Sequence, residues 1–434
     1  MINYKESFYN LYYHLNNKTF IYNIVSGVGA NVNNSVLNAL KTGKFSDEEL
    51  SELRKIGFVV PSEVNEYLRL KELAMGEIWN TNPKDLLFVI TPSMGCNLNC
   101  KYCFEPYEVR KQHSPVMSDE TQANVIKFIK NRILIESKKL LRHVSLSFFG
   151  GEPTLHLKIV MQISSTIKKI CEDNNIIFDA RLITNGTLLK KDVGARLYKT
   201  GISMAQITLD GNAEDYVERK GVSKDVYDTL IKNICDNSDV LKIKIRVNVD
   251  NNNKDHIPYL MEYLFDELNL KDKISLYFAQ VKKWNESNDI CYISAEDYGK
   301  YLETYLAFAE EKGWISSIIK KPPKMKITPC GMLRSGSVGI GYDGSLYGCT
   351  HGFSNPDSYK TGNINTGLFA NIFDYNFKML QENEKCSECK YFPICWGGCR
   401  NNIRLYNDRP DCNLVKKETD LCVSYSLKSH MTDE

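Results

Sequence analysis

The sequence lacks any long uninterrupted apolar segment. Its first residues, MINYKESFYN, contain no apolar run of signal-peptide length. The stretch LLFVI at residues 86–90 is far too short to span a bilayer. These absences exclude a signal peptide in this stretch and give no membrane partner, so we expect a cytoplasmic protein.

A charge bias, internal repeats and low-complexity segments are also missing. Lys and Arg number 55 against 53 Asp and Glu, which leaves a formal net charge of +2. Nothing in this balance favours nucleic acid or an anionic membrane as the main partner. With 43% hydrophobic and 25% charged residues the composition is that of a globular protein. The length of 434 residues predicts two or three domains.

Cysteine, in contrast, is abundant. In a cytosolic chain, 14 cysteines argue against disulfides and for metal or redox chemistry. One cluster lies in CNLNCKYC at residues 96–103, and eight more cysteines crowd the last quarter of the chain. The remaining Cys171, Cys235 and Cys291 stand alone, and we interpret them as small buried residues.

Residues 1–82 read as a small separate domain. FIYNIVSG (20–27) has the pattern of a strand, and NNSVLNALKTG (33–43) that of a helix with an N-cap Asn and a terminal Gly. SDEELSELRKIGFVV (46–60) begins with a capping box, Ser46 and Glu49, and runs from helix into strand. We expect a winged-helix-like arrangement. Its helices mix acidic with basic residues, which favours peptide docking over DNA binding.

Residues 83–318 alternate strand and helix patterns. The predicted strands are LLFVIT (86–91), HVSLSFF (143–149), IFDARLIT (177–184), SMAQITLD (203–210), KIKIRVNV (242–249) and ISLYFAQ (274–280). Six β–α units with parallel crossovers predict an α/β fold, a partial (β/α)6 TIM-like barrel. IIKKPPKMKITPC (318–330) reads as a linker into a cysteine-rich domain at 319–434.

The strand KIKIRVNV (242–249) distinguishes the helix-facing side of the predicted sheet from its lumen-facing side. Apolar residues alternate with Lys244, Arg246 and Asn248 along it. If the apolar side meets the outer helices, the polar side faces the barrel lumen, which indicates an open barrel that holds a polar ligand. An edge strand with one solvated face is the alternative.

Three cysteines in the loop after the first strand need an explanation. Structural zinc takes four ligands, and a disulfide takes two. Three thiolates, Cys96, Cys100 and Cys103, can bind three irons of a [4Fe–4S] cluster and leave the fourth iron open for chemistry. The C-terminal ends of barrel strands are also where active sites lie.

The spacing C-x3-C-x2-C resembles the signature of the radical S-adenosylmethionine (SAM) enzymes. In that family the open iron chelates SAM, whose reductive cleavage yields a 5′-deoxyadenosyl radical that abstracts hydrogen from an unreactive C–H bond. The resemblance extends to Tyr102, which matches an aromatic residue that touches adenine in the family.

Two further segments carry the resemblance. FFGGEP (148–153) resembles the family's GGE segment, in which Gly150 and Gly151 let backbone approach the methionyl amino group and Glu152 accepts from it. In LITNG (182–186), Thr184 and Asn185 match positions that hydrogen-bond the ribose or carboxylate of SAM.

Other candidate site residues lie at the ends of later strands. Gln206, Thr208 and Asp210 share one face and are expected to line the substrate space, with Asp210 as a catalytic candidate. Arg246 is expected to pair with the SAM carboxylate or to hold a substrate carbonyl.

The tail resembles the SPASM extension of radical SAM maturases, which carries two auxiliary [4Fe–4S] clusters. The family pattern implies Cys330, Cys349 and Cys399 for the first auxiliary cluster and Cys386, Cys389 and Cys395 for the second. We favour Cys412 over Cys422 to complete the second. Cys422 is then a ligand of the first or is spare. A zinc ribbon is the competing interpretation of residues 386–399.

These features together imply a radical SAM/SPASM maturase with three [4Fe–4S] clusters and SAM. We expect it to install a thioether or carbon–carbon cross-link in a ribosomal precursor peptide, with electrons from an external donor such as flavodoxin or ferredoxin. The first domain would bind the leader, with FIYNIVSG or GFVV (57–60) offering a strand edge. One alternative is a formylglycine-generating anaerobic sulfatase maturase, whose relatives carry an Asp where this chain has Thr350. Another is an iron–sulfur electron-transfer module.

Overall fold

A computed structural model describes residues 2–103, 105, 110, 114–282, 292–354, 359–368 and 383–431. The chain divides into two compact units. The barrel unit contains Asn80–Ile318 and Gly331–Lys378, and the cysteine-rich unit contains Met1–Trp79, Ile319–Cys330 and Met379–Glu434. The sequence predicts three consecutive domains with boundaries near 82 and 318. The structure instead joins the N-terminal segment to the end of the tail and adds the start of the tail to the barrel.

The barrel unit is built on parallel strands that run in chain order. They are β6 (Asp85–Ile90), β7 (His143–Phe148), β8 (Ile177–Thr184), β9 (Ile202–Thr208), β10 (Lys242–Val249) and β11 (Ile274–Gln280). Each pairs in parallel with the next. These strands match the six segments expected from the sequence, and the partial TIM-like barrel is confirmed.

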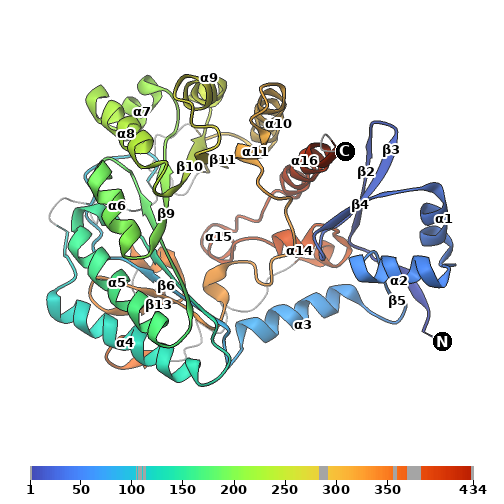
Figure 1. Cartoon of the computed structure of the whole chain (residues 1–434), viewed down its shortest axis with the longest axis horizontal. Helices are drawn as coiled ribbons and strands as arrows, with labels where there is room; N and C mark the ends of the chain where they lie inside the picture. The colour runs from blue at the N-terminus through green and yellow to red at the C-terminus, as the bar shows by residue number, and fades with distance from the viewer. Residues whose placement is uncertain are drawn as a thin grey trace. The chain divides into compact units, whose positions relative to one another are not determined.

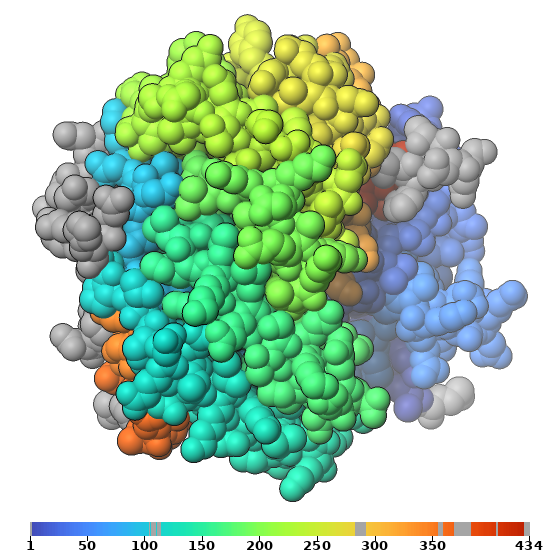
Figure 2. All heavy atoms as spheres, turned by 60° about the vertical axis from the view of Figure 1, so that its left-hand side comes forward, coloured from blue at the N-terminus to red at the C-terminus, as the bar shows by residue number. Residues whose placement is uncertain are grey.

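Helices cover the outer face of this sheet (Figure 1), and their atoms form most of the surface that faces the viewer in Figure 2. They are α4 (Asp119–Ser137), α5 (Leu157–Asp173), α6 (Lys191–Lys199), α7 (Ala213–Lys220), α8 (Lys224–Asn237), α9 (Ile257–Glu262) and α10 (Ala295–Glu311). Alternate strand residues, such as Leu146, Leu182 and Ile207, are fully buried against the helices. This alternation leaves the other face of the sheet polar. Among the described residues, no helix is both long and apolar enough to cross a membrane.

Strand β10 shows the predicted alternation. Ile243, Ile245 and Val247 are buried, whereas Lys244 is exposed and Arg246 half-buried. β10 pairs with β9 on one side and β11 on the other. It is therefore an interior strand, and the edge-strand interpretation was wrong.

The start of the tail extends the sheet beyond β6. β12 (Ser337–Ile340) pairs in parallel with β6, and β13 (Ser345–Tyr347), β14 (Lys360–Asn363) and β15 (Gly367–Leu368) follow in antiparallel order. A Cβ on Gly336 would lie 2.1 Å from the carbonyl oxygen of Asp85, so only glycine permits this close junction.

The N-terminal segment contains the two predicted helices, α1 (Asn34–Thr42) and α2 (Asp47–Ile56). The side chain of Asn33 caps α1, and Ser46 with Glu49 forms the capping box of α2. An antiparallel sheet precedes them, in the order β2 (Asn10–Leu15), β3 (Lys18–Asn23) and β4 (Val28–Val32). β1 (Tyr4–Glu6) pairs with β5 (Val59–Pro61), and α3 (Glu66–Ile78) follows.

This topology corrects one expectation about strand edges. FIYNIVSG overlaps β3, which pairs with β2 on one side and β4 on the other. β3 therefore has no open edge for a peptide. The sequence reasoning missed β2 and β4, whose short stretches carry weak alternation.

The two ends of the chain share one hydrophobic core. Tyr9, Tyr22 and Leu70 pack in one cluster with Phe392 and Trp396 from the tail. Tail elements here are α14 (Phe392–Cys395), α15 (Arg400–Tyr406) and α16 (Cys412–Met431). The N-terminal sheet is therefore part of the cysteine-rich unit.

Candidate active site

The loop of three cysteines begins just after β6. The backbone N–H of Cys96 donates to the carbonyl of Arg110 (3.1 Å), and that of Cys103 donates to the carbonyl of Cys100 (3.2 Å). Burial raises the pKa of Cys96 to about 11 and that of Cys103 to about 12, against the opposing charge of Arg110. Since ligation requires thiolates, bound iron would have to displace these protons.

The glycines after β7 bring two loops together. A Cβ on Gly151 would lie 2.2 Å from the carbonyl oxygens of Met94 and Gly95, and one on Gly150 would lie 2.7 Å from that of Ser93. The N–H of Glu152 donates to the carbonyl of Gly95 (2.8 Å). In this structure the glycines therefore place the loop after β7 directly against the start of the cysteine loop.

Glu152 joins the ends of β7 and β8. One carboxylate oxygen accepts from the backbone N–H and hydroxyl of Thr154 (2.9 and 2.5 Å) and from the hydroxyl of Thr184 (2.7 Å). The other accepts from the backbone N–H of Asn185 (2.6 Å). Burial raises the pKa of Glu152, and these hydrogen bonds work against that rise. Glu152 thus holds the turn that carries Thr184 and Asn185.

Asn185 lies beside the first cysteine. Its amide donates to the side-chain oxygen of Asn97 (2.8 Å) and toward the sulfur of Cys96 (3.9 Å). Its oxygen accepts from the N–H and hydroxyl of Thr187 (3.0 and 2.7 Å). The structure therefore brings Cys96, Glu152, Thr184 and Asn185 together, as the motifs predict.

We expected Asp210 to line the substrate space, but in the structure it is buried and paired. It is fully buried, forms an ion pair with Lys220 (2.8 Å), and accepts from the hydroxyl of Tyr102 and from the N–H of Asn248 (2.9 Å). Burial alone raises the pKa of Asp210, but the charges of Lys220 and Arg219 outweigh it and hold the pKa below its usual value. An open substrate-facing carboxylate is therefore not what the structure shows.

The sequence reasoning missed the basic partners of this carboxylate. Arg219 and Lys220 end α7 as an ordinary "RKG" helix terminus, and no local pattern marks them as buried. Gly221, with φ +64°, ends the helix. Only the fold places these side chains under the cysteine loop.

The polar inner face of the sheet offers further ligand-binding groups. The Nε of Arg246 donates to the side chain of Asn248 (2.8 Å), and its guanidinium lies 6.0 Å from the ring centre of Tyr277. On β8, Arg181 donates to the hydroxyl of Ser147 (3.1 Å). Gln206 and Thr208 are half-buried on the same face of β9. These cations and amides can bind a carboxylate or a peptide carbonyl.

A second constellation lies in the cysteine-rich unit. Cys386, Cys389, Cys395 and Cys412 line a cavity of about 540 Å³ together with Lys385, Arg409 and Lys416. Burial raises the pKa of the Cys395 thiol, and the other three thiols raise it further, which indicates that they are near it. Among the described residues, no three cysteine, histidine or carboxylate side chains come close enough to ligate one single metal ion.

The remaining tail cysteines are not brought to this cavity. Cys422 lies in α16 and does not line it. Cys330 and Cys399 belong to the cysteine-rich unit and Cys349 to the barrel unit, so their common ligation of a first auxiliary cluster stays a prediction.

The three isolated cysteines were expected to be buried, and the structure confirms this only for Cys171. Cys171 is buried as expected, and burial raises the pKa of its thiol to about 12, whereas Cys235 is only half-buried. Cys291 lies outside the described residues.

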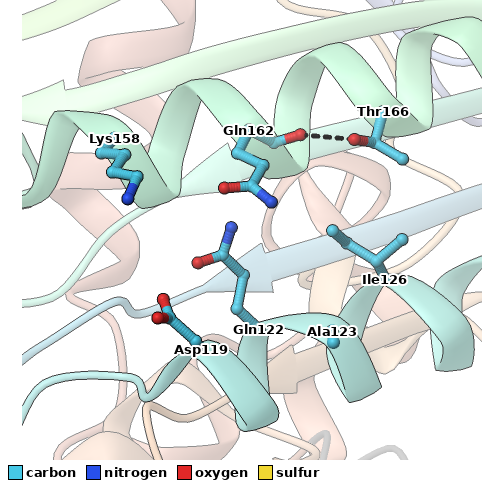
Figure 3. A pocket seen from close by; sticks show the side chains of 7 residues that line it. All are labelled: Asp119, Gln122, Ala123, Ile126, Lys158, Gln162 and Thr166. Atoms are coloured by element: carbon cyan, nitrogen blue, oxygen red, sulfur yellow. Dashed lines mark hydrogen bonds between the residues drawn. The ribbon is translucent and has the colours of Figure 1, made fainter.

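A groove on the outside of the barrel has no comparable chemistry. It has a volume of about 510 Å³ and lies between α4 and α5 (Figure 3). Its lining residues are Asp119, Gln122, Ala123, Ile126, Lys158, Gln162 and Thr166. They lie on the outer helices and include no cysteine, so we place the candidate active site at the cysteine loop.

Comparison with known proteins agrees with this choice. The radical SAM superfamily model matches residues 90–264. The cysteine-type anaerobic sulfatase-maturating enzyme of Clostridium perfringens (strain ATCC 13124) is 26% identical over 378 residues, covering 79% of this chain and 94% of the relative. A radical SAM cyclopropyl synthase of Paramaledivibacter caminithermalis is 22% identical, covering 88% of this chain and 86% of the relative.

Solved structures confirm the fold. That of hexahistidine-tagged anSMEcpe with bound AdoMet superimposes with a TM-score of 0.61 at 22% identity, covering 81% of this chain and 95% of the other. Native anSMEcpe with bound AdoMet and the Cp18Cys peptide gives a TM-score of 0.59. The three thiols, the GGE loop and the Asn185 turn fit a SAM-binding cluster. Residues 90–264 therefore form a radical SAM domain, and the chain around it is similar to radical SAM enzymes.

Proposed function

We propose that this chain is a peptide maturase that oxidises a cysteine or serine side chain in a polypeptide substrate. The observation that carries this proposal is the extent of its likeness to the sulfatase-maturating enzymes. The match covers 94% of the C. perfringens enzyme and so extends well beyond the radical SAM domain. The comparisons support this oxidation better than the cross-link expected from the sequence.

Each part of the site has a role in this chemistry. When bound, the cluster and SAM supply a 5′-deoxyadenosyl radical that abstracts hydrogen. Cys96, Cys100 and Cys103 would hold the cluster, and Asn185, whose amide points toward the sulfur of Cys96, would hydrogen-bond the cofactor. Arg246, on the polar inner face, orients a carboxylate or carbonyl of cofactor or substrate.

The oxidation balances as a two-electron step. One hydrogen atom leaves the β-carbon of the cysteine to the deoxyadenosyl radical. One further electron passes to an iron–sulfur acceptor, and the thiol proton leaves, which gives a thioaldehyde. Water then replaces sulfur, releases sulfide and leaves the aldehyde of formylglycine. A serine loses the same electrons and protons and gives the aldehyde directly.

A cross-linking activity is the second candidate, favoured by one specific position. Cys349 is followed by Thr350, which begins a short 3-10 helix, Thr350–Phe353. In the sulfatase maturases that this chain resembles, an aspartate at the position of Thr350 acts as a base. Without that carboxylate, a substrate radical that closes on a neighbouring side chain, as thioether or carbon–carbon bond, needs no base at this position.

We also propose three [4Fe–4S] clusters. Cys386, Cys389, Cys395 and Cys412 around one cavity support the second auxiliary cluster. Cys330, Cys349 and Cys399 are proposed for the first. When bound, these clusters would accept the second electron, and an external one-electron donor such as flavodoxin or ferredoxin would start each turnover.

The N-terminal sheet is proposed to dock a leader segment of the substrate by strand addition. Its outer strands are β2 and β4. On β2, the carbonyl of Asn10 already accepts from the Nζ of Lys390 (2.8 Å). We therefore assign the leader to the edge of β4.

Co-expression with candidate peptides under anaerobic conditions tests the function. Mass spectrometry should find a peptide product that reacts with hydrazide reagents, formed either from a cysteine that has lost its sulfur or from a serine that has lost two hydrogens. A loss of two hydrogens with all sulfur retained and no aldehyde would establish the cross-link instead. The Cys100→Ala variant is the control and should leave the peptide unmodified. If neither change occurs in any peptide while SAM is cleaved, the peptide-maturase proposal is wrong.

A further inference from the structure

The last turn of α7 is hydrogen-bonded to the backbone of the cysteine loop. The backbone N–H of Asn99 donates to the carbonyl of Lys220 (3.2 Å), and that of Lys101 donates to the carbonyl of Arg219 (3.0 Å). Asn99 and Lys101 flank Cys100 directly. The middle of the loop is therefore tied by its backbone to the end of this helix.

The side chains of the same two residues hold Tyr102. The ammonium of Lys220 donates to the hydroxyl of Tyr102, and that hydroxyl donates to the carboxylate of Asp210. The ammonium lies 4.7 Å from the ring centre of Tyr102, and the guanidinium of Arg219 lies 4.9 Å from it. Tyr102 lies between Cys100 and Cys103 in the sequence, so contacts that fix its ring also restrict the backbone that carries those two cysteines.

The charges of this network balance and are withdrawn from solvent. Lys220 is 2% exposed and pairs with Asp210, and Arg219 is 6% exposed and pairs with Asp250. Asp250 in turn accepts from the backbone N–H groups of Asn252 and Asn253 (2.9 and 3.3 Å). Buried ion pairs are costly to desolvate and weak contributors to stability, and their best-attested use is to specify one arrangement.

We propose that Lys220 is a positioning residue for the SAM-binding loop. It fixes the ring of Tyr102, and with it the spacing of Cys100 and Cys103, through a hydroxyl contact that is neutralised by Asp210. Arg219 supports the same ring from its guanidinium. The role needs only the radical SAM chemistry of the chain and holds for any peptide substrate.

Two substitutions probe this contact from its two ends. Tyr102→Phe keeps the ring and removes only the hydroxyl. Lys220→Met keeps the length of the side chain and removes the ammonium, but it leaves Asp210 buried without its cation. The double variant Asp210→Asn, Lys220→Met removes both charges, so that no unpaired charge is left in the interior.

The matched control is Glu218→Gln, in the same turn of α7. Glu218 pairs with Lys101 of the cysteine loop (3.1 Å), but both side chains are exposed. Exposed pairs of this kind contribute little. This variant should behave as the unchanged protein in every measurement.

The measurements separate positioning from folding. In the apo protein, the rates of alkylation of Cys96, Cys100 and Cys103 are mapped by mass spectrometry, with the melting temperature recorded alongside. In the reconstituted protein, iron content, KM for SAM and kcat for reductive SAM cleavage are measured. Tyr102→Phe and the double variant should retain iron and fold, alkylate faster at Cys100 and Cys103, and raise KM for SAM by about tenfold, equivalent to roughly 1.4 kcal/mol.

The double variant decides between the two roles if Lys220→Met alone fails to fold. Recovered stability with a raised KM and faster alkylation supports the positioning role. Recovered stability with KM and alkylation rates equal to those of the unchanged protein would show that the network only stabilises the fold. A purely structural network is also the conclusion if Tyr102→Phe matches Glu218→Gln in both measurements.

Discussion

Cys412 and Cys422 are ten residues apart on the same helix, but only Cys412 lies at the cavity of the other cysteines. Cys412 lines the cavity with Cys386, Cys389 and Cys395, whereas Cys422 does not. Cys412→Ala should therefore lower the iron content of the anaerobically reconstituted protein by about one cluster in three, since a cluster needs its fourth thiolate. Cys422→Ala is the matched control. Iron and sulfide analysis measures the cluster content of both variants. Equal iron loss in the two would contradict the assignment of Cys412.

Substitution of Arg246 tests whether the polar inner face of the barrel binds cofactor or substrate. The residue is half-buried, and its side chain donates to that of Asn248. Arg246→Ala should lower the free energy of unfolding by only about 1.5 kcal/mol or less, because hydrogen bonds of this kind contribute little net stability. SAM cleavage or peptide turnover should fall by about tenfold or more, if the residue binds cofactor or substrate as proposed.

Lys242→Ala supplies the comparison for Arg246. Lys242 begins the same strand, at the end opposite to the active site of such barrels, and is exposed. We expect unchanged SAM cleavage in this variant. Loss of stability without loss of turnover in Arg246→Ala would contradict its proposed role.

At the scale of elements, β4 carries the docking proposal. Strand addition uses backbone groups, so a proline at an exposed edge position removes a donor without removing a specific side chain. Asn31→Pro should weaken binding of a full-length precursor by at least about tenfold, roughly 1.4 kcal/mol. Fluorescence anisotropy with a labelled precursor measures this.

A second element provides the control for β4. His14→Pro changes the opposite edge strand, β2, at an exposed position. It should leave precursor binding close to that of the unchanged chain, provided that both variants show native circular dichroism. Weakened binding in His14→Pro alone would place the leader on β2 and overturn the assignment to β4.

For the whole molecule, the shared core changes what a truncation does. Separable domains would allow residues 1–79 to be removed without loss of the tail. However, Tyr9, Tyr22 and Leu70 bury Phe392 and Trp396 in one cluster. Exposing each large tail side chain costs about 1.5–3 kcal/mol. We expect the truncated chain to keep the barrel unit and its SAM-binding cluster but to lose iron from the cysteine-rich unit.

Limited proteolysis and iron analysis check this expectation for the truncation. Cleavage should concentrate after residue 383, while residues 85–280 stay protected. A truncated chain that retains all its iron and a protected tail would show that the N-terminal sheet is dispensable for that core.

Local patterns were sufficient for much of the fold and for the centre of the site. The β8, β10 and β11 boundaries match the predicted segments because alternation with period two is a property of a few consecutive residues. Cys96, Glu152 and Asn185 meet because each follows the C-terminal end of a parallel strand, and such ends share one edge. Caps such as Ser46 with Glu49 are equally local.

Tertiary structure alone decided the rest, since those contacts join residues that no local pattern relates. Tyr102 and Lys220 are 118 positions apart, and Tyr13 reaches Asp420 across 407. Which elements pack together decides that Lys220 is buried, that Asp210 pairs with it, and that the two chain ends share one core. The sequence by itself determined the motifs of the candidate site and the segments that form its strands, whereas packing determined which charged side chains contact its cysteine loop.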